Sequence, residues 1–307
     1  MYGTKRMLIL NCDDFGQSRP ANRAIMHLLK ARKVSSATMM PPAPAFAEAA
    51  EWARKNDVRN VGLHLTMNSE FPAYRWRSLT RHPSLHDADG CMHLTVLDFE
   101  RKADTKAVKA EILAQFQKVR DAGLNISHVD NHMGSLYGLA TGRSFLPFVL
   151  RQCASRGLPF RLFRNVYPKD EFLASIPNVK GMLAKIVALA DTLGVCIPDY
   201  LLSHPYHIQE NETYDSFKQM MIAKIYDLPE GVSETYIHPA TADDFMGKAI
   251  PSWEKRVWEY RLALDDDFAY ALRDAHVQLA NYQYVRDNLR KSRLRAAFRM
   301  AGLLMRR

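Results

Sequence analysis

The sequence predicts an α/β protein built as a single (β/α) barrel of seven or eight strands. Short apolar runs typical of buried strands alternate with segments of helical periodicity along the chain. With 307 residues, 47% of them hydrophobic, the chain can bury the core of such a barrel. No internal repeat or low-complexity tract interrupts the alternation, which argues against a helix bundle or a β-sandwich.

The first half of the chain contains four predicted strands. They are expected at 7–10, 36–40, 60–66 and 125–130, with helices at 18–33, 43–55 and 105–122. Ser18 is a candidate N-cap and Pro20 stands early in the first helix, where its missing N–H is tolerated. Gly123 follows the last apolar position of the third helix and is expected to end it.

The segment 68–103 shows no clear regular structure. Prolines and the Asp89-Gly90 pair indicate turns, while Phe71, Tyr74 and Trp76 argue against disorder. Long excursions of this kind are commonly functional, so we expect it to cover the substrate, with a packed surface loop as the alternative.

The second half continues the alternation. Strands are expected at 159–163, 199–203, 234–237 and 277–282, and helices at 144–156, 169–193, 214–226 and 253–274. Gly231 precedes the strand at 234–237, and His238-Pro239 follows it.

Cysteine usage and the N-terminus indicate a soluble, cytoplasmic protein. The four cysteines are scattered, without a CxxC pair, which suits a reducing compartment better than a disulfide framework. The first six residues run directly into the first strand without the apolar stretch of a signal peptide, and no run approaches a membrane span.

The formal charge of +9 is concentrated at the C-terminus. Its basic residues are Arg286, Arg290, Lys291, Arg293, Arg295, Arg299, Arg306 and Arg307, opposed only by Asp287. We therefore divide the chain into a barrel domain, 1–285, which includes the excursion 68–103, and a basic amphipathic segment, 286–307. This segment fits either peripheral contact with an anionic membrane or a barrel-covering helix. The nearly balanced remainder argues against a nucleic-acid surface, and a homodimer stays open.

Side chains able to bind metal or transfer protons follow several predicted strands. They are Asp13, Asp14, His64, His128, Asp130, His132 and His238. In (β/α) barrels the active site forms where the C-terminal ends of the strands converge. His64 alone would fit a hydrogen-bonded core histidine, and Asp13-Asp14 alone would fit a turn or helix cap, but the coincidence at four strand ends favours one site.

Two imidazoles and one carboxylate with an open position form a common catalytic metal site. A bound divalent ion activates water and polarises a carbonyl, so an amide or ester can be hydrolysed near neutral pH. A second carboxylate can accept the proton of the water and a histidine opposite can protonate the leaving amine. Asp13 or Asp14 and His238 fit these two roles.

These motifs resemble the YdjC-like carbohydrate deacetylase family. The similar segments are Asn11-Cys12-Asp13-Asp14-Phe15-Gly16, Gly62-Leu63-His64-Leu65, Pro83-Ser84-Leu85 with Asp89-Gly90, His128-Val129-Asp130-Asn131-His132 and Glu234-Thr235-Tyr236-Ile237-His238-Pro239. They occur in the family's order over roughly residues 7–285. The resemblance implies removal of the N-acetyl group from acetylated amino sugars such as chitooligosaccharides, on a barrel similar to that of polysaccharide deacetylases.

The resemblance also implies roles for individual residues. It implies three metal ligands, Asp14, His64 and His132. Asp13 becomes the general base, His238 the general acid, and Asp130 a carboxylate that supports a metal-bound histidine. His128 precedes the strand end and is expected to be structural. The cofactor is one divalent ion, Zn²⁺ or Mg²⁺, and two histidine ligands favour zinc.

Some positions depart from the family pattern, and other functions stay open. Cys12, Asn131, Met133-Gly134 and Ala240 differ from the residues common in the family, but none is a proposed ligand. The alternatives are a metal-dependent hydrolase of a phosphoester or cyclic amide, and a membrane-associated binding protein whose site has decayed. The histidine pair in His204-Pro205-Tyr206-His207 fits either the substrate cleft or a hydrogen-bonded loop.

Overall fold

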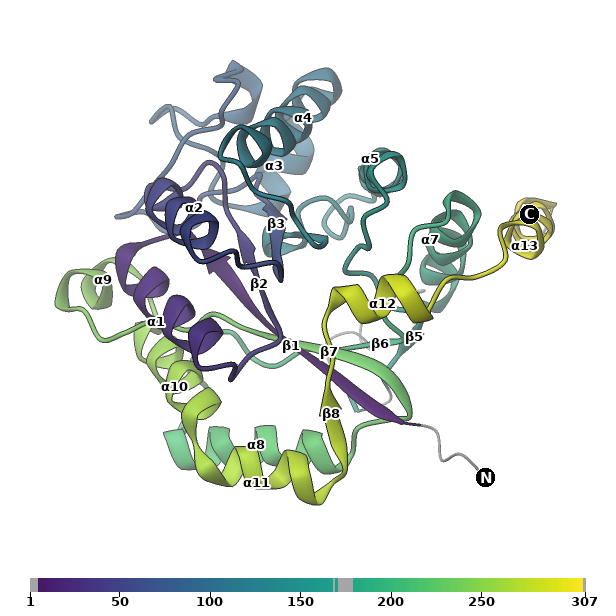
Figure 1. Ribbon diagram of the computed structural model, residues 1–307. Coiled ribbons are helices and arrows are strands. Elements are labelled where there is room, and N and C mark those ends of the chain that lie inside the picture. Colours follow the sequence, from purple (N-terminus) through teal and green to yellow (C-terminus); the bar gives the residue numbers. More distant parts are fainter. Residues whose placement is uncertain (1–4, 168, 171–178, 306–307) are drawn as a thin grey trace.

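The computed structural model, which describes residues 5–167, 169–170 and 179–305, is organised around one parallel sheet (Figure 1). Its strands are β1 (Arg6–Phe15), β2 (Ser36–Met39), β3 (Val61–Leu65), β4 (Val129–Asn131), β5 (Asn165–Val166), β6 (Tyr200–Leu202), β7 (Gly231–Ile237) and β8 (Val277–Leu279). Their order is β4-β3-β2-β1-β7-β6-β5, and β8 pairs separately with β1. Every pairing is parallel, as a barrel built from βα units requires.

The sheet curls into a barrel-like shape around β1, its longest strand. The N–H of Arg161 donates to the Val129 carbonyl at 2.9 Å, and Phe160 and Val129 form a parallel bridge. This bridge links the segment that enters β5 back to β4 at the other end of the sheet. The predicted α/β barrel of seven or eight strands is therefore confirmed.

Helices flank the sheet between successive strands (Figure 1). They are α1 (Arg19–Lys30), α2 (Phe46–Lys55), α3 (Val96–Lys102), α4 (Thr105–Asp121), α5 (Leu146–Arg156), α7 (Val179–Leu193), α8 (Tyr214–Tyr226), α9 (Asp244–Ala249), α10 (Trp253–Leu264), α11 (Asp266–Asp274), α12 (Tyr282–Asn288) and α13 (Arg293–Met305). Ser18 caps α1 as predicted, with its Oγ accepting from the Ala21 N–H at 3.3 Å. Pro20 occupies the first turn, where its ring does not disturb the helix.

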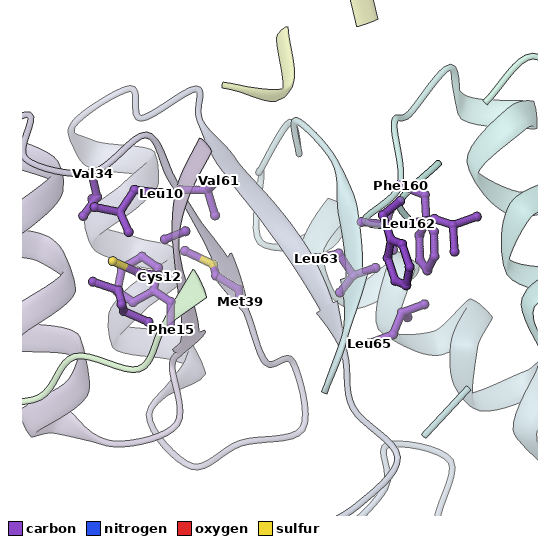
Figure 2. Packing of buried hydrophobic residues seen from close by; sticks show 14 of the residues in the cluster. Leu10, Cys12, Phe15, Val34, Met39, Val61, Leu63, Leu65, Phe160 and Leu162 are labelled. Carbon is purple, nitrogen blue, oxygen red and sulfur yellow. The ribbon is translucent and has the colours of Figure 1, made fainter. Parts of the chain in front are cut away.

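The two faces of β1 serve different purposes because side chains alternate along a strand. Leu8, Leu10 and Cys12 belong to the main hydrophobic core, together with residues of α1 and α2. Figure 2 shows Leu10, Cys12 and Phe15 packed near Met39 and Val34 of this core. On the opposite face, Met7 and Ile9 join a smaller cluster with Tyr282, and beyond them the face becomes polar at Asn11 and Asp13. Strand alternation thus turns Asp13 away from the main core.

One predicted strand, 159–163, is wrong: within the described residues its one bridge is the isolated pairing of Phe160 with Val129, and the strand that follows is β5. The backbone explains the difference. The N–H of Leu162 donates to the Phe160 carbonyl at 2.9 Å, a contact two residues back that closes a tight turn and breaks the ladder. This turn lies beside Arg161, whose side chain enters the barrel.

Several other predicted elements are shorter in the structure, among them the strand expected at 125–130, in place of which β4 spans only Val129–Asn131. The helix expected at 253–274 is divided at Asp265, whose side chain caps α11 by accepting from the Asp267 N–H at 3.0 Å. The strand expected at 277–282 ends at Leu279, because Tyr282 begins α12. Of the helix expected at 169–193, residues 171–178 lie outside the described residues, 169–170 are not helical, and α7 covers Val179–Leu193.

The excursion 68–103 contains more regular structure than predicted, with a 3₁₀ turn at Pro83–Leu85 and the helix α3. Phe71, Trp76 and Met92 form a second hydrophobic cluster with Met40 and Trp253. This cluster anchors the excursion beside the carboxyl ends of the strands, close to the predicted site.

The C-terminal segment forms α12 and α13, and α13 packs alongside α7 (Figure 1). Ala296 of α13 is buried and Met300 is half-buried, whereas Leu294 and Phe298 are exposed. Arg306 and Arg307 lie outside the described residues. In the part of the chain that the structure covers, every helix is too short or too polar to cross a membrane. The division between 1–285 and 286–307 stays a prediction.

Candidate active site

The three predicted metal ligands meet where β1, β3 and β4 end. Asp14 Oδ1 lies 3.5 Å from His64 Nε2 and 3.3 Å from His132 Nδ1. One nitrogen or oxygen of each residue lies within 4.8 Å of the others, and all three side chains are buried. A carboxylate oxygen and two imidazole nitrogens converging in this way suit a divalent ion of the zinc type.

Asp14 is held in place by an unusual backbone and by two side chains. Its φ of +64° is left-handed, a conformation that Asp tolerates better than most residues, and it turns the chain out of β1. Gln17 and Arg256 donate to Oδ2 at 2.9 and 2.8 Å. Although burial alone would raise it, the pKa of Asp14 is held well below its ordinary value by Arg256 and His132.

The other carboxylate oxygen of Asp14, Oδ1, gives the best indication that this point can bind a metal ion. Within residues 5–167, 169–170 and 179–305, Asp14 Oδ1 is buried and accepts no hydrogen bond. An unsatisfied buried carboxylate oxygen is costly, and this atom is the one that faces the two imidazoles. The donor set therefore fits a metal ion at this point.

Carboxylates orient both imidazoles through the ring nitrogens that face away from Asp14. His64 Nδ1 donates to Asp130 Oδ1 at 2.6 Å, and His132 Nε2 donates to Glu70 Oε2 at 2.9 Å. Such outer partners fix the tautomer of a ligating histidine and increase its basicity. Burial would lower the pKa of His132, but Glu70 and Asp14 outweigh burial and raise it to about 10.

A second acidic group lies deeper and already holds a cation from the protein. Arg161 donates from Nη1 and Nη2 to Asp13 at 2.6 and 2.7 Å, and Nη2 lies 3.0 Å from Asp130 Oδ2. Its Nε donates to Glu234 Oε1 at 2.9 Å. Asp13, His64 and Asp130 could also hold a metal by distance alone. Because the guanidinium neutralises these carboxylates, the site at Asp14 is the better candidate.

The Arg161 network affects the protonation of the acids around it. Although burial disfavours its carboxylate, the pKa of Asp130 is lowered by Arg161 and His64. Burial raises the pKa of Glu234 to about 7, and Arg161 opposes that rise only in part. Tyr282 also donates a hydrogen bond to Glu234. Asp130 therefore stays anionic near neutral pH.

His238 lies at the end of β7 and is held by Glu259 of α10. Its backbone N–H donates to Glu259 Oε2 at 2.6 Å, and its Nδ1 lies 3.8 Å from the same oxygen. Burial lowers the pKa of His238, but Glu259 and Asp14 shift it upward overall. His204 Nε2 donates to the other Glu259 oxygen at 2.8 Å. Both histidines thus share one buried carboxylate.

These groups open into a cleft of about 1360 Å³. Asp13, His64, His132 and His238 line it, and Glu70 and Phe71 bring the excursion 68–103 to its wall. The segment His204-Pro205-Tyr206-His207 lines it as well, so both histidines are part of the cleft, and His204 is also hydrogen-bonded to Glu259. The arrangement can place a substrate between a metal site with a carboxylate beside it and a histidine.

Comparison with known proteins supports this interpretation of the strand ends. The YdjC-like protein family matches residues 7–274, which span β1 to α11 and every candidate site residue. The chain belongs to the YdjC-like family. A carbohydrate deacetylase of Halalkalibacterium halodurans is 33% identical over 259 residues, which are 83% of this chain and 94% of that protein. A carbohydrate deacetylase of Brevibacillus brevis is 25% identical over 278 residues, which are 90% of this chain and 98% of that protein.

Other relatives of the YdjC-like chain match in part or at the level of the fold. A carbohydrate deacetylase of Listeria monocytogenes is 35% identical over 128 residues, 41% of this chain, and the match spans half of that protein. The crystal structure of an Enterococcus faecalis V583 protein, described as a candidate cellobiose-phosphate cleavage protein, has a TM-score of 0.69 and 24% identity. The structural match covers 91% of this chain and 98% of the Enterococcus faecalis chain. This similarity shows the fold.

In this YdjC-like chain, the structure brings all six predicted site residues to one place, and it puts His128 elsewhere. His128 lies deeper in the barrel, where its ring stacks on Tyr282 with the centroids 3.8 Å apart. Gly62 makes room for it, because a Cβ at this position would come within 2.6 Å of the imidazole. Its Nδ1 lies 2.9 Å from Ser127 Oγ.

Sequence reasoning did not identify four residues that shape the site of this YdjC-like chain. They are Glu70, Arg161, Arg256 and Glu259. Arg161 gave one usable signal, since it is a single charge in the apolar run 159–163. Arg256 and Glu259 stand three residues apart on a highly charged helix, and Glu70 lies in a loop, so no periodicity distinguishes them.

Proposed function

We propose that this YdjC-like chain is a metal-dependent hydrolase that removes the N-acetyl group from an acetylated amino sugar, either an oligosaccharide or a glycolipid headgroup. The observation that carries the proposal is the convergence of Asp14, His64 and His132 on one buried point, with Asp13 and His238 lining the same cleft. The relatives named carbohydrate deacetylases support the substrate class.

Asp14, His64 and His132 would hold one divalent ion. When bound, such an ion lowers the pKa of its water and polarises the acetyl carbonyl. Zinc is the better candidate than magnesium, because two imidazole ligands suit zinc whereas magnesium prefers oxygen. Asp130 and Glu70 hold one nitrogen of each imidazole, so the other nitrogen of each ring is the one turned toward the ion.

Asp13 is the proposed general base. Its carboxylate lines the cleft, and Oδ2 lies 4.0 Å from His64 Nε2, next to the ligand set. Asn11 and Arg161 hold the carboxylate by hydrogen bonds to both oxygens. This fixed position allows Asp13 to accept a proton from the attacking water as the new C–O bond forms.

His238 is the proposed general acid. Tyr206 packs edge-on against its ring at 4.9 Å, and Glu259 lies behind it. The upward shift of its pKa favours the imidazolium, which can donate a proton to the amine as the C–N bond breaks. The products are then acetate and the free amino sugar.

Several finer expectations stay predictions. They are the cytoplasmic location, the homodimer, and membrane contact through 286–307. The described residues leave each of them untested.

The Asp13→Asn variant tests the proposal. It should reduce acetate release from N-acetylglucosamine oligomers by about 10²–10⁴-fold, while zinc content, measured by atomic absorption, stays near one ion per chain. Circular dichroism checks that the variant folds, and the exposed Asp57→Asn is the matched control. Near-normal turnover in Asp13→Asn would show that Asp13 is not the base. Release of phosphate from phosphorylated sugars without release of acetate would favour the phosphoesterase alternative.

A further inference from the structure

The part of the cleft beyond the metal ligands is unlike a sugar-binding surface. Its wall includes Met133 of the turn after β4, Met182 of α7, Met220 of α8 and Met300 of α13. These four residues are called the methionine wall below. Methionine is flexible and polarizable, so a surface built from it adapts to apolar chains of varied shape.

Aliphatic side chains extend this wall. Leu139 and Ile186 line the same cleft, and Leu139, Met133 and Met182 are among the large apolar residues that remain exposed. Sugar rings are commonly bound by hydrogen bonds and aromatic faces. The residues that α7 contributes to the cleft are mostly aliphatic instead, with one charged exception: Val179, Met182, Leu183, Lys185, Ile186 and Leu189. An apolar surface of this kind in a ligand cleft indicates an apolar ligand.

The size of the cleft leads to the same conclusion. Its volume of about 1360 Å³ exceeds the roughly 300–1,000 Å³ of ordinary small-molecule sites. The acetamido group of a substrate must reach His132 and His238 at one end. A single sugar at that end would leave the methionine wall uncovered.

The helix that carries Met300 also suits an amphiphilic ligand. Ala296 and Met300, one turn apart, face the protein, while Leu294 and Phe298, also one turn apart, are 69% and 72% exposed. Arg295 and Arg299 flank this second face and are exposed. Exposed apolar residues flanked by arginines are typical of a helix at an anionic lipid surface.

We propose that the substrate is an N-acetylated amino sugar linked to a long aliphatic chain, and that the chain lies along the methionine wall. This inference rests on the proposed function and specifies its substrate class. The sugar would sit at the metal site and the chain would lie along the cleft-lining sides of α7 and α13, which pack side by side (Figure 1). The ligand is therefore a glycolipid rather than a free oligosaccharide.

A series of glycosides tests this inference. Methyl, butyl and octyl N-acetyl-β-glucosaminides share one headgroup and differ only in chain length. Each fully buried methylene would increase binding about fourfold. Because the wall stays partly open, we expect kcat/KM for acetate release to rise at least ~30-fold from methyl to octyl, below the micelle concentration. N-acetylchitotriose provides the oligosaccharide comparison.

A charged residue in the wall should remove this preference. Met182→Lys is expected to lower the octyl-to-methyl ratio of kcat/KM at least ~10-fold. Leu113→Lys is the matched control: Leu113 of α4 is 43% exposed against 42% for Met182, and it lies outside the cleft. This control should leave the ratio and the methyl activity unchanged. Calorimetry of octyl glycoside binding to the metal-free protein gives a second readout, in which Met182→Lys should bind more weakly.

The outcomes separate this inference from the proposed function. Acetate release with equal kcat/KM for methyl and octyl glycosides, or a steeper rise with sugar number than with chain length, would overturn the glycolipid assignment and leave the deacetylase intact. If the protein were a dimer that Met182→Lys converts to a monomer, the methionine wall would be a contact surface for a second copy of the chain. This result would also overturn the glycolipid assignment. In a third outcome, the protein binds the octyl glycoside, Met182→Lys weakens that binding, and no glycoside releases acetate. This result would support a binding site for the aliphatic chain and refute the deacetylase activity.

Discussion

Replacing Arg161 with methionine tests the electrostatic core of the site. The side chain is 6% exposed and lies within 2.6–3.0 Å of carboxylate oxygens of Asp13, Asp130 and Glu234. Methionine keeps much of the volume but removes the cation, so the carboxylates lose their neutralising partner. Removing one member of a buried ion pair costs about 3–5 kcal/mol, since the remaining charge stays desolvated.

The carboxylates around Arg161 differ in how easily they lose their charge. The pKa of Glu234, raised by burial to about 7, lets it take up a proton near neutral pH, so its charge can disappear at little cost. The pKa of Asp130 is shifted downward by Arg161 and His64, so Arg161→Met removes one of the causes that keep it ionised. We therefore expect a loss of about 3–5 kcal/mol from an unfolding free energy typically about 5–15 kcal/mol.

Urea unfolding followed by circular dichroism, in EDTA at pH 7, measures this loss. The double variant Arg161→Met with Glu234→Gln should recover about 1 kcal/mol or more, because neighbouring groups in one network are not additive. The single variant Glu234→Gln measures the effect on stability of replacing this carboxylate with an amide while Arg161 is present. A loss below about 1 kcal/mol in Arg161→Met, or strict additivity in the double variant, would refute the view that one guanidinium neutralises this acidic cluster.

Two further predictions concern metal affinity and acid stability. Glu70→Gln should weaken zinc binding about 10–100-fold, because His132 Nε2 loses its anionic acceptor, and competition with a chromophoric chelator measures this. The control is Asp191→Asn, which changes a buried carboxylate paired with Arg164 and should leave the zinc affinity unchanged. If Glu70→Gln also left the zinc affinity unchanged, the proposed ligand geometry would be contradicted. Burial lowers the pKa of His128 to about 3, whereas the unfolded chain takes up this proton near 6.5. Between these values the unfolded state binds more protons, so stability should fall as pH falls, by about 1.4 kcal/mol per pH unit more than in His128→Gln. Parallel pH profiles of unfolding in the two proteins would show that His128 is not buried in its neutral form.

Sequence periodicity determined the fold class and most elements because burial imposes it directly on the chain. A strand such as β3, buried on both faces, needs an apolar run, and α8 begins and ends at the predicted residues. Strand-end positions also placed Asp14, His64 and His132 among seven candidates, since a barrel gathers residues from strand ends wherever they lie in the chain. The resemblance to the YdjC-like family then selected these three as the proposed ligands.

Only the tertiary structure could identify the residues that control those ligands. Arg161, Glu70 and Arg256 act through contacts with residues 62 to 242 positions away in the chain, and their spacing carries no period that indicates such a contact. The methionine wall has the same origin, because its residues come from four separate elements. Local periodicity records which face of an element is buried, whereas partners across the barrel depend on how the elements pack.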